Sequence, residues 1–179
     1  GGMMWNSWLD RELTLAGRLV LTSGEVVLAR TGPIARIPQL AIHLDRDVNP
    51  GGLKLDPQKH LHPVWTVDNP YGNVLEYVAR TAGLDDASQV AAFDLILTPS
   101  QGPGFFGDKG QFIAASRQDS LSSVHPGLVA LERLAAQGTP AGGDVTVFMC
   151  FDHEEVGSES RTGAAGPILE TVLRRTAKA

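Results

Sequence analysis

Val145-Thr146-Val147-Phe148-Met149-Cys150-Phe151 runs directly into Asp152-His153-Glu154-Glu155-Val156-Gly157-Ser158-Glu159-Ser160. The β-branched and aromatic residues of the first segment are typical of a buried strand. Gly157 permits a tight turn directly after it. Because ligands in open α/β sheets bind beyond the carboxyl ends of the strands, the junction predicts a ligand site.

The adjacent carboxylates of Glu154 and Glu155 suggest a bound cation, because two neighbouring negative charges are costly to keep together. Asp119 follows a second predicted strand, residues 111–115, and parallel pairing would bring all three carboxylates to one edge of the sheet. Oxygen ligands supplemented by imidazole suit Zn²⁺, Mn²⁺ or Co²⁺. One glutamate could bind metal while the other accepts a proton from water. A solvated acidic loop, or helix N-capping, explains the same spacing equally well.

Composition restricts the class of protein. The chain has 179 residues, a net charge of -5 and acidic and basic residues interspersed, so we expect neither a nucleic-acid partner nor a membrane surface. The single cysteine, Cys150, is predicted to be a buried and reduced core residue, which is compatible with a cytoplasmic location. Both ends interrupt patterned sequence, so we expect an internal fragment of a longer protein.

The first part of the chain is predicted to be mainly β. A strand over residues 12–21 and a hairpin partner over 25–30 come first, followed by an extended segment before Pro38. Apolar spacing over residues 71–82 predicts a helix, and residues 93–97 predict a strand. The loop over residues 98–110, rich in glycine and proline, is the predicted domain boundary.

After this boundary, strands and helices alternate. A helix over residues 121–135 separates the two predicted strands, and a final helix around Ile168–Leu173 begins after Pro167. Alternation of this kind predicts part of an α/β sheet. The predicted fold class is therefore α/β, with a mainly β domain over residues 1–110 and a partial α/β domain over 111–179.

Two histidines, His153 and His43, are considered as candidate functional residues. His153 adjoins the carboxylates, although a lone histidine is more often a hydrogen-bonded structural residue than a ligand. His43 lies among apolar residues, which favours a core position with its polar atoms satisfied.

Three separated motifs together resemble the aspartyl aminopeptidases, the M18 family of metallopeptidases. The first two are Trp8-Leu9-Asp10-Arg11-Glu12-Leu13-Thr14-Leu15-Ala16-Gly17-Arg18 and Ile37-Pro38-Gln39-Leu40-Ala41-Ile42-His43-Leu44. The third is the acidic stretch of residues 152–160, which is similar to the family's Glu-Glu-Val-Gly-Ser motif. The resemblance runs nearly from end to end.

The resemblance implies a function and a set of roles. Glu154 matches the general base, Glu155 a metal ligand and Asp119 the aspartate that bridges two divalent ions, with Zn expected and Mn or Co as alternatives. His43 matches a histidine that reaches the active site of a neighbouring subunit, which would replace the core position favoured above. The implied protein is a cytoplasmic homo-oligomer, a dodecamer built from dimers, that removes N-terminal and often acidic residues from peptides. Residues 1–110 would be its dimerisation domain.

This chain departs from the family pattern in three respects. Ser116-Arg117-Gln118-Asp119-Ser120 stands where the family usually has Pro-Arg-Leu-Asp-Asn. Pro126 falls inside an expected helix, which should therefore start late or kink. Only two of the five metal ligands expected from the resemblance are present, so the isolated fragment is predicted to be inactive. The alternative function is a non-catalytic oligomerisation or scaffold module.

Overall fold

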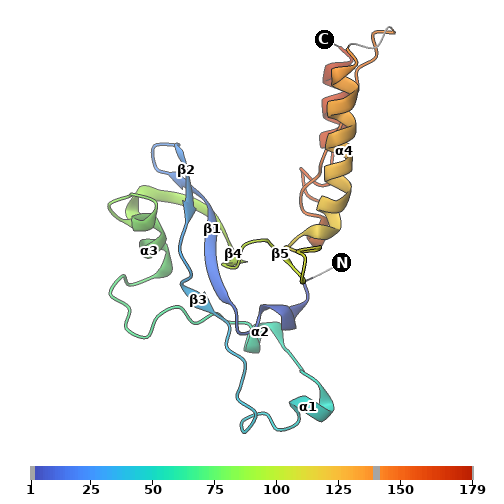
Figure 1. Ribbon diagram of the computed structural model, residues 1–179. Helices are drawn as coiled ribbons and strands as arrows, with labels where there is room; N and C mark the ends of the chain where they lie inside the picture. The colour runs from blue at the N-terminus through green and yellow to red at the C-terminus, as the bar shows by residue number, and fades with distance from the viewer. Residues whose placement is uncertain (1–2, 139–141, 179) are drawn as a thin grey trace. The chain divides into compact units, whose positions relative to one another are not determined.

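The computed structural model describes residues 3–138 and 142–178 and has a mixed α/β architecture, which confirms the predicted fold class (Figure 1). It divides into two compact units. The first comprises Met4–Gly102, and the second comprises Met3 and the described residues from Pro103 onward.

The first unit is built on a four-stranded sheet centred on β1, Glu12–Leu21. β2, Val26–Arg30, and β4, Val90–Pro99, both pair antiparallel with β1, as does the short β3, Ala35–Arg36. The predicted hairpin of the first two strands is confirmed. Its turn is closed by the Gly24 amide, which donates to the Leu21 carbonyl at 2.9 Å.

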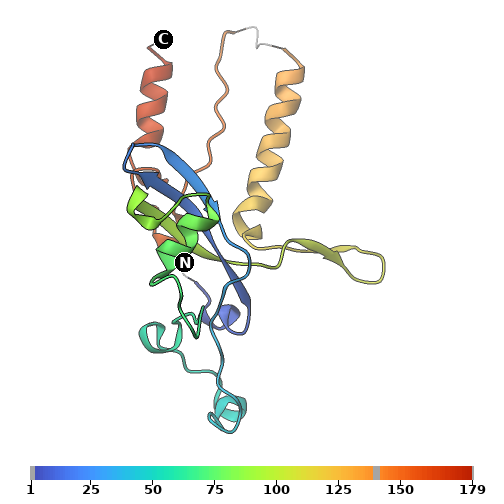
Figure 2. The ribbon, with the colours of Figure 1, turned by 90° about the vertical axis from the view of Figure 1, so that its left-hand side faces the viewer.

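Helix α3, Val74–Thr81, lies beside this sheet (Figure 2). The Asn73 side chain caps its first turn by accepting from the Glu76 amide at 2.9 Å, and Gly83 follows with a φ of 85°. The buried Val78 of α3 packs with Leu19 of β1 and Ala29 of β2. The helix predicted over residues 71–82 is therefore present, with its first turn starting at Val74.

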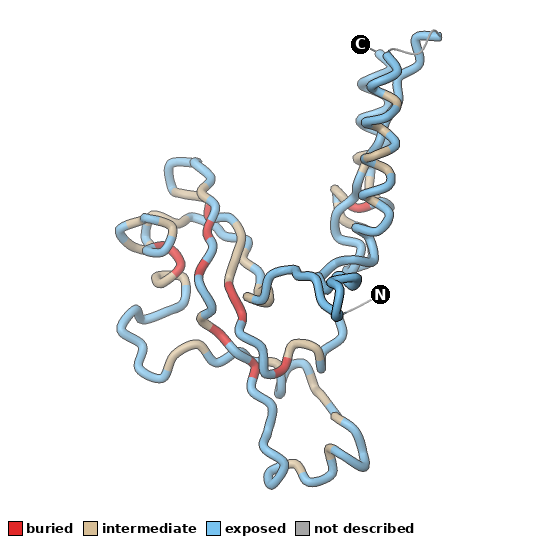
Figure 3. The backbone as a smooth tube through the Cα atoms, in the orientation of Figure 1, coloured by how far each residue is buried: buried red, intermediate tan, exposed pale blue. Residues whose placement is uncertain are grey.

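A second core cluster lies at the other end of β1 and contains Leu9, Leu13, Ala35 and Ile37. Figure 3 shows that burial follows the central strands and α3, whereas the connecting segments are exposed. These segments carry short helices only: η1 Trp5–Trp8, α1 Val48–Gly51, α2 Pro57–His60 and η2 Ala87–Gln89.

Asp86 caps η2, and the spacing Asp86-Ala87-Ser88-Gln89 predicts a capping box of this kind. Its carboxylate accepts from the hydroxyl and the amide of Ser88, and these hydrogen bonds hold the pKa of Asp86 below its ordinary value. The predicted reciprocal bond differs by one residue, because the Gln89 side chain accepts from the Asp85 amide at 2.9 Å and not from that of Asp86.

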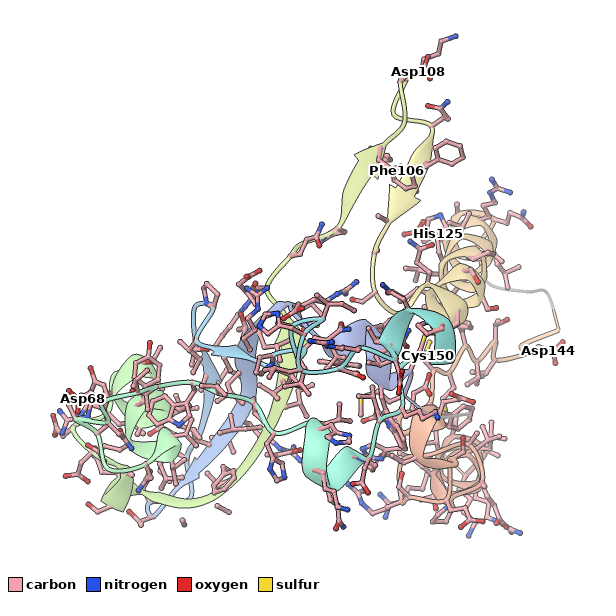
Figure 4. The ribbon with its side chains drawn as sticks, turned by 90° about the horizontal axis from the view of Figure 1, so that it is seen from below. Asp68, Phe106, Asp108, His125, Asp144 and Cys150 are labelled. Carbon is pink, nitrogen blue, oxygen red and sulfur yellow. The ribbon has the colours of Figure 1, made fainter. Side chains whose placement is uncertain are left out.

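The second unit contains a hairpin and two longer helices. β5, Gly104–Phe106, and β6, Phe112–Ala114, pair antiparallel, with Phe106 stacked on Phe112 at 5.1 Å between ring centroids and Asp108 at the tip (Figure 4). Helix α4 spans Gln118–Ala136, the turn η3 spans Glu154–Val156, and α5 spans Ile168–Thr176. In α5, Arg174 forms an ion pair with Glu170, four residues earlier, at 2.7 Å.

The buried strand predicted over residues 145–151 is absent from the structure. The segment has no ladder partner, and Val145, Val147 and Phe148 are exposed. Cys150 is likewise an exposed free thiol and not a core residue. β-branched and aromatic residues favour a strand only where a neighbouring strand completes the hydrogen bonds, and no described segment pairs here.

The strand predicted over residues 111–115 is present as β6, but its pairing is antiparallel to β5 and not parallel. The segment over residues 98–110 is accordingly not a plain loop, because it contains β5. Its glycine and proline content predicts a loop, whereas two of those glycines, Gly107 and Gly110, form the turn of a short hairpin.

Helix α4 neither starts late nor breaks at Pro126. It begins at Gln118 and runs through the proline to Ala136. Pro126 cannot donate to the carbonyl four residues earlier, that of Ser122, but Ser122 is exposed, so water can satisfy that group. The following Gly127 accommodates the ring of Phe148, because a Cβ there would lie 2.7 Å from Cζ of Phe148.

Within residues 3–138 and 142–178, none of the helices has the length and apolar character of a membrane-spanning segment.

The packing of the first unit predicts a clear contrast between two leucines in paired strands. Leu19 is fully buried, at 0% exposure, whereas Leu28 is 81% exposed. Leu19→Ala should lower the free energy of unfolding by about 2–5 kcal/mol, because it removes buried methyl groups and leaves a cavity. Leu28→Ala should change it by about 0.5 kcal/mol or less. Urea unfolding measures the free energy of unfolding of both variants. Equal losses of this free energy would contradict the placement of Leu19 in the core.

Candidate active site

The two adjacent glutamates lie on a single tight turn, η3. The Gly157 amide donates to the Glu154 carbonyl at 2.9 Å, and the Ser158 amide donates to the His153 carbonyl at 2.9 Å. These bonds close the turn on both sides of the Glu154–Glu155 peptide, so the backbone that carries both carboxylates is held locally.

Left-handed residues bracket this turn. His153 has φ 62° and ψ 31°, Gly157 has φ 97°, and Ser158 has φ 63°. Glycine adopts this region freely, but each non-glycine residue is disfavoured there by about 1–2 kcal/mol. Strained backbone of this kind is often found at functional sites, where surrounding contacts hold it in place.

The surrounding loop supplies such contacts. The Asp152 amide donates to the Thr162 carbonyl at 3.1 Å, and the Ala165 amide donates to the Ser158 carbonyl at 3.1 Å. Gly163 is buried beneath them. A Cβ on Gly163 would lie 2.6 Å from the carbonyl carbon of Ser158 and closer still to its oxygen, so only glycine fits without a shift.

Glu154 and Glu155 are both exposed at the surface of this loop. Their carboxylates are therefore accessible to a cation or a substrate, and neither forms a side-chain hydrogen bond within the described residues. Solvent exposure also lowers the cost of holding two like charges side by side.

Asp119 lies in the first turn of α4, two residues after Arg117, which occupies the N-cap position with a left-handed φ of 63°. The carboxylate is exposed. Negative charge in the first turn is favoured by the helix dipole, so this position also suits a purely structural aspartate.

The predicted meeting of Asp119, Glu154 and Glu155 does not occur. Across residues 3–138 and 142–178, no three His, Cys, Asp or Glu side chains gather closely enough to hold a metal ion. The prediction relied on two parallel strands, and neither the strand over 145–151 nor the parallel pairing of β6 exists. Carboxylate oxygens suit a divalent cation chemically, but the described residues do not on their own fit a complete metal centre.

His43 is exposed in a turn over residues 41–44, closed by the Leu44 amide donating to the Ala41 carbonyl at 2.8 Å. The core position that its apolar neighbours favoured is therefore wrong. Those neighbours, Leu40, Ile42 and Leu44, are exposed as well, so the apolar run belongs to a surface segment.

The first two motifs of the family resemblance meet at Asp10. The Asp10 amide donates to the Ile37 carbonyl at 2.9 Å, and its carboxylate accepts from the Gln39 amide at 3.2 Å. A pocket of about 240 Å³ borders this junction and the His43 turn, with one acidic and several basic groups in its wall. It is lined by Leu9, Pro38, Gln39, Leu40, Asp45, Leu53, Lys54, Leu55, Lys59, His60 and His62.

Sequence reasoning missed the contact between His153 and Ser160. The imidazole Nδ1 lies 2.6 Å from the Ser160 hydroxyl oxygen. The two are seven positions apart. That spacing would hold their side chains too far apart for contact in a helix or a strand, so only the closed loop brings them together. Gly157 was the available sequence signal that this segment forms a tight turn, but it does not indicate the contact.

Comparisons with known proteins agree on one family. The sequence profile described as "Aminopeptidase I zinc metalloprotease (M18)" matches residues 1–179. "Probable M18 family aminopeptidase 2" from Streptomyces avermitilis is 44% identical over 179 residues, covering 98% of this chain and 41% of the relative. The protein of the same name from Mycobacterium tuberculosis is 40% identical over 182 residues, covering 98% and 41%.

Solved structures show the same relationship. The chain is similar to "Cryo-EM structure of the Ape4 and Nbr1 complex", with a TM-score of 0.81 and 27% identity, covering 99% of this chain and 38% of that one. It is also similar to "Crystal structure of prApe1", with a TM-score of 0.78 and 29% identity, covering 99% and 42%. The chain thus spans about 41% of the length of the curated relatives cited here. With the family profile matched from the first residue to the last, the chain belongs to the M18 family of metallopeptidases.

Proposed function

We propose that this chain is part of a metal-dependent aminopeptidase that removes the N-terminal residue from peptides. The observation that carries the proposal is the match of residues 1–179 to the M18 family, including the Glu154–Glu155 turn. The chain spans 41% of its curated relatives, so the activity is proposed for the longer protein and not for these residues alone.

Within that protein we propose Glu154 as the general base, with Glu155 and Asp119 as ligands of the metal centre. The locally closed backbone of η3 supports these roles, because it holds the two glutamates in a constant relation. A divalent cation, when bound, would polarise the scissile carbonyl and increase the acidity of water. Glu154 would accept a proton from the attacking water and deliver it to the leaving amine.

The remaining donors of a two-metal site would come from the parts of the longer protein that lie outside this chain. Zinc is the proposed metal, in keeping with the family's description as a zinc metalloprotease. Mn and Co are the alternatives that the same oxygen donors would accept.

The oligomeric part of the proposal concerns the first unit. We propose that this mainly β region is the dimerisation domain, that the protein forms a dodecamer built from dimers, and that His43 contacts the substrate in a neighbouring subunit. The exposure of His43 on a surface turn supports this role. A preference for acidic N-terminal residues and a cytoplasmic location complete the proposal, both following from the resemblance to the aspartyl aminopeptidases.

The test is an assay of the full-length protein on peptides that differ only at the first residue, Asp, Glu or Leu. Release of the free first residue is expected, with the N-acetylated peptide as the uncleaved control. Dialysis against a chelator should abolish release, and added zinc should restore it. Cleavage of the acetylated peptide would contradict an aminopeptidase. No cleavage of any peptide would contradict the proposal as well and would favour a scaffold role.

The 179-residue chain by itself is expected to release no amino acid from the same peptides. Its described residues bring no three potential ligands together, so a catalytic metal has too few donors. The measurement is turnover by the purified chain in excess zinc, with the full-length protein as the positive control. Chelator-sensitive turnover by the chain alone would show that it contains a complete centre.

A further inference from the structure

We infer that Ser160 is a positioning residue that, through His153, holds the turn on which Glu154 is presented. This inference rests on the proposed function, because it concerns the presentation of the proposed base. It starts from the side-chain contact between His153 and Ser160, at 2.6 Å, which joins the two ends of the acidic motif.

His153 is held from both sides. Its backbone amide donates to Asp152 Oδ1 at 2.8 Å, and its Nε2 lies 3.6 Å from Asp152 Oδ2. On the other side, its Nδ1 meets the Ser160 hydroxyl. The Asp152 contacts come from the adjacent residue and constrain little beyond it. The Ser160 contact spans the whole turn, so it is the one that ties the imidazole to the far side of the loop.

The backbone of His153 needs such a restraint. It adopts left-handed φ and ψ values of 62° and 31°, and its carbonyl accepts the Ser158 amide at 2.9 Å. A histidine released from Ser160 is free to leave the left-handed region, which L-residues other than glycine disfavour. The hydrogen bonds that close η3 depend on that carbonyl, so the orientation of Glu154 would become variable.

Removing the hydroxyl of Ser160 takes away none of the loop's backbone hydrogen-bonding groups. The Ser160 carbonyl accepts from the Gly163 amide at 3.1 Å, and any residue at position 160 keeps this bond. Among the hydrogen bonds of the described residues, the hydroxyl itself contacts the His153 ring alone. Ser160→Ala therefore removes one contact, and Ser160→Thr restores the hydroxyl.

The experiment uses the full-length protein with Ser160→Ala, Ser160→Thr and the control Ser123→Ala. Ser123 is exposed on α4, and its side chain makes no hydrogen bond within the described residues. Hydrogen exchange, steady-state kinetics and zinc content are measured for each variant. Hydrogen–deuterium exchange of a peptide covering residues 152–166 reports the turn, with and without zinc. Steady-state kinetics and zinc content report its consequence.

Ser160→Ala is expected to speed exchange at the amides of residues 156–158 and to lower kcat by about 10- to 100-fold, the usual cost of misplacing a reacting group. KM and zinc content should stay within about twofold of the parent, because binding groups are untouched. Ser160→Thr should restore both exchange and kcat, and Ser123→Ala should change neither.

Unchanged exchange in Ser160→Ala would overturn the positioning role whatever the activity. Faster exchange with unchanged kcat would show that the turn does not govern the base, which also overturns it. The exchange measurement needs no turnover. An inactive parent protein would therefore contradict the proposed aminopeptidase, while exchange would still decide whether Ser160 holds the turn.

Discussion

Glu154→Gln in the full-length protein is expected to lower kcat by about 10²–10⁴-fold, the contribution usual for a general acid–base residue. Glutamine keeps the size and hydrogen-bonding ability of the side chain but cannot take up a proton. Glu154 is exposed, and surface substitutions usually change stability by about 0.5 kcal/mol or less, so a folding defect does not account for so large a loss. Zinc content should remain at the parent level.

Glu155→Gln should behave differently, although it lies one residue away on the same turn. If Glu155 is a metal ligand, its replacement should lower zinc content and the affinity measured by chelator competition, and added zinc should partly restore turnover. The control is Glu159→Gln, which removes one negative charge from the same exposed loop. Parent-like activity in Glu154→Gln, or loss of zinc in that variant, would show that the two roles are assigned wrongly.

The first unit could be predicted well because its signals are local. The strand over residues 12–21 and its hairpin partner pair with each other, and the helix before Gly83 packs on them within the same hundred residues. Each predicted strand or helix therefore packs against another element of the same chain. Hydrophobic periodicity is most reliable when the face it predicts is covered by neighbouring sequence.

The second unit shows the opposite case. The apolar run over residues 145–151 has the composition of a buried strand, yet it is exposed and unpaired. The composition of this run indicates that its side chains favour burial, but it does not identify the segment that would bury them.

The candidate site was predictable in residue type but not in geometry. The glutamate pair and its glycine indicated a turn that carries candidate catalytic and metal-binding side chains, and the structure shows η3 at that place. The predicted approach of Asp119 failed because it depended on a parallel sheet. The His153–Ser160 contact was not predictable, because a closed loop and not a periodic element sets their separation.

Gly163→Ala is expected to disturb this loop strongly, because the added methyl group would collide with backbone atoms. Gly163 is buried, and a Cβ there would lie 2.6 Å from the carbonyl carbon of Ser158, a backbone atom that cannot rotate away. Relief requires Ser158 to move, and its amide closes the turn against the His153 carbonyl at 2.9 Å. Overpacking of this kind costs about 1–3 kcal/mol.

Because the displaced atoms are those that close η3, the effect should reach the glutamates and not stay at residue 163. We expect faster hydrogen exchange across residues 152–166 and a kcat lowered by about 10²-fold in the full-length protein. Gly102→Ala is the matched control, since a Cβ there meets nothing within 4 Å. If Gly163→Ala left both exchange and kcat at the level of Gly102→Ala, the loop would not be the rigid support of the glutamates. If exchange rose and kcat held, the support would exist without governing the reaction.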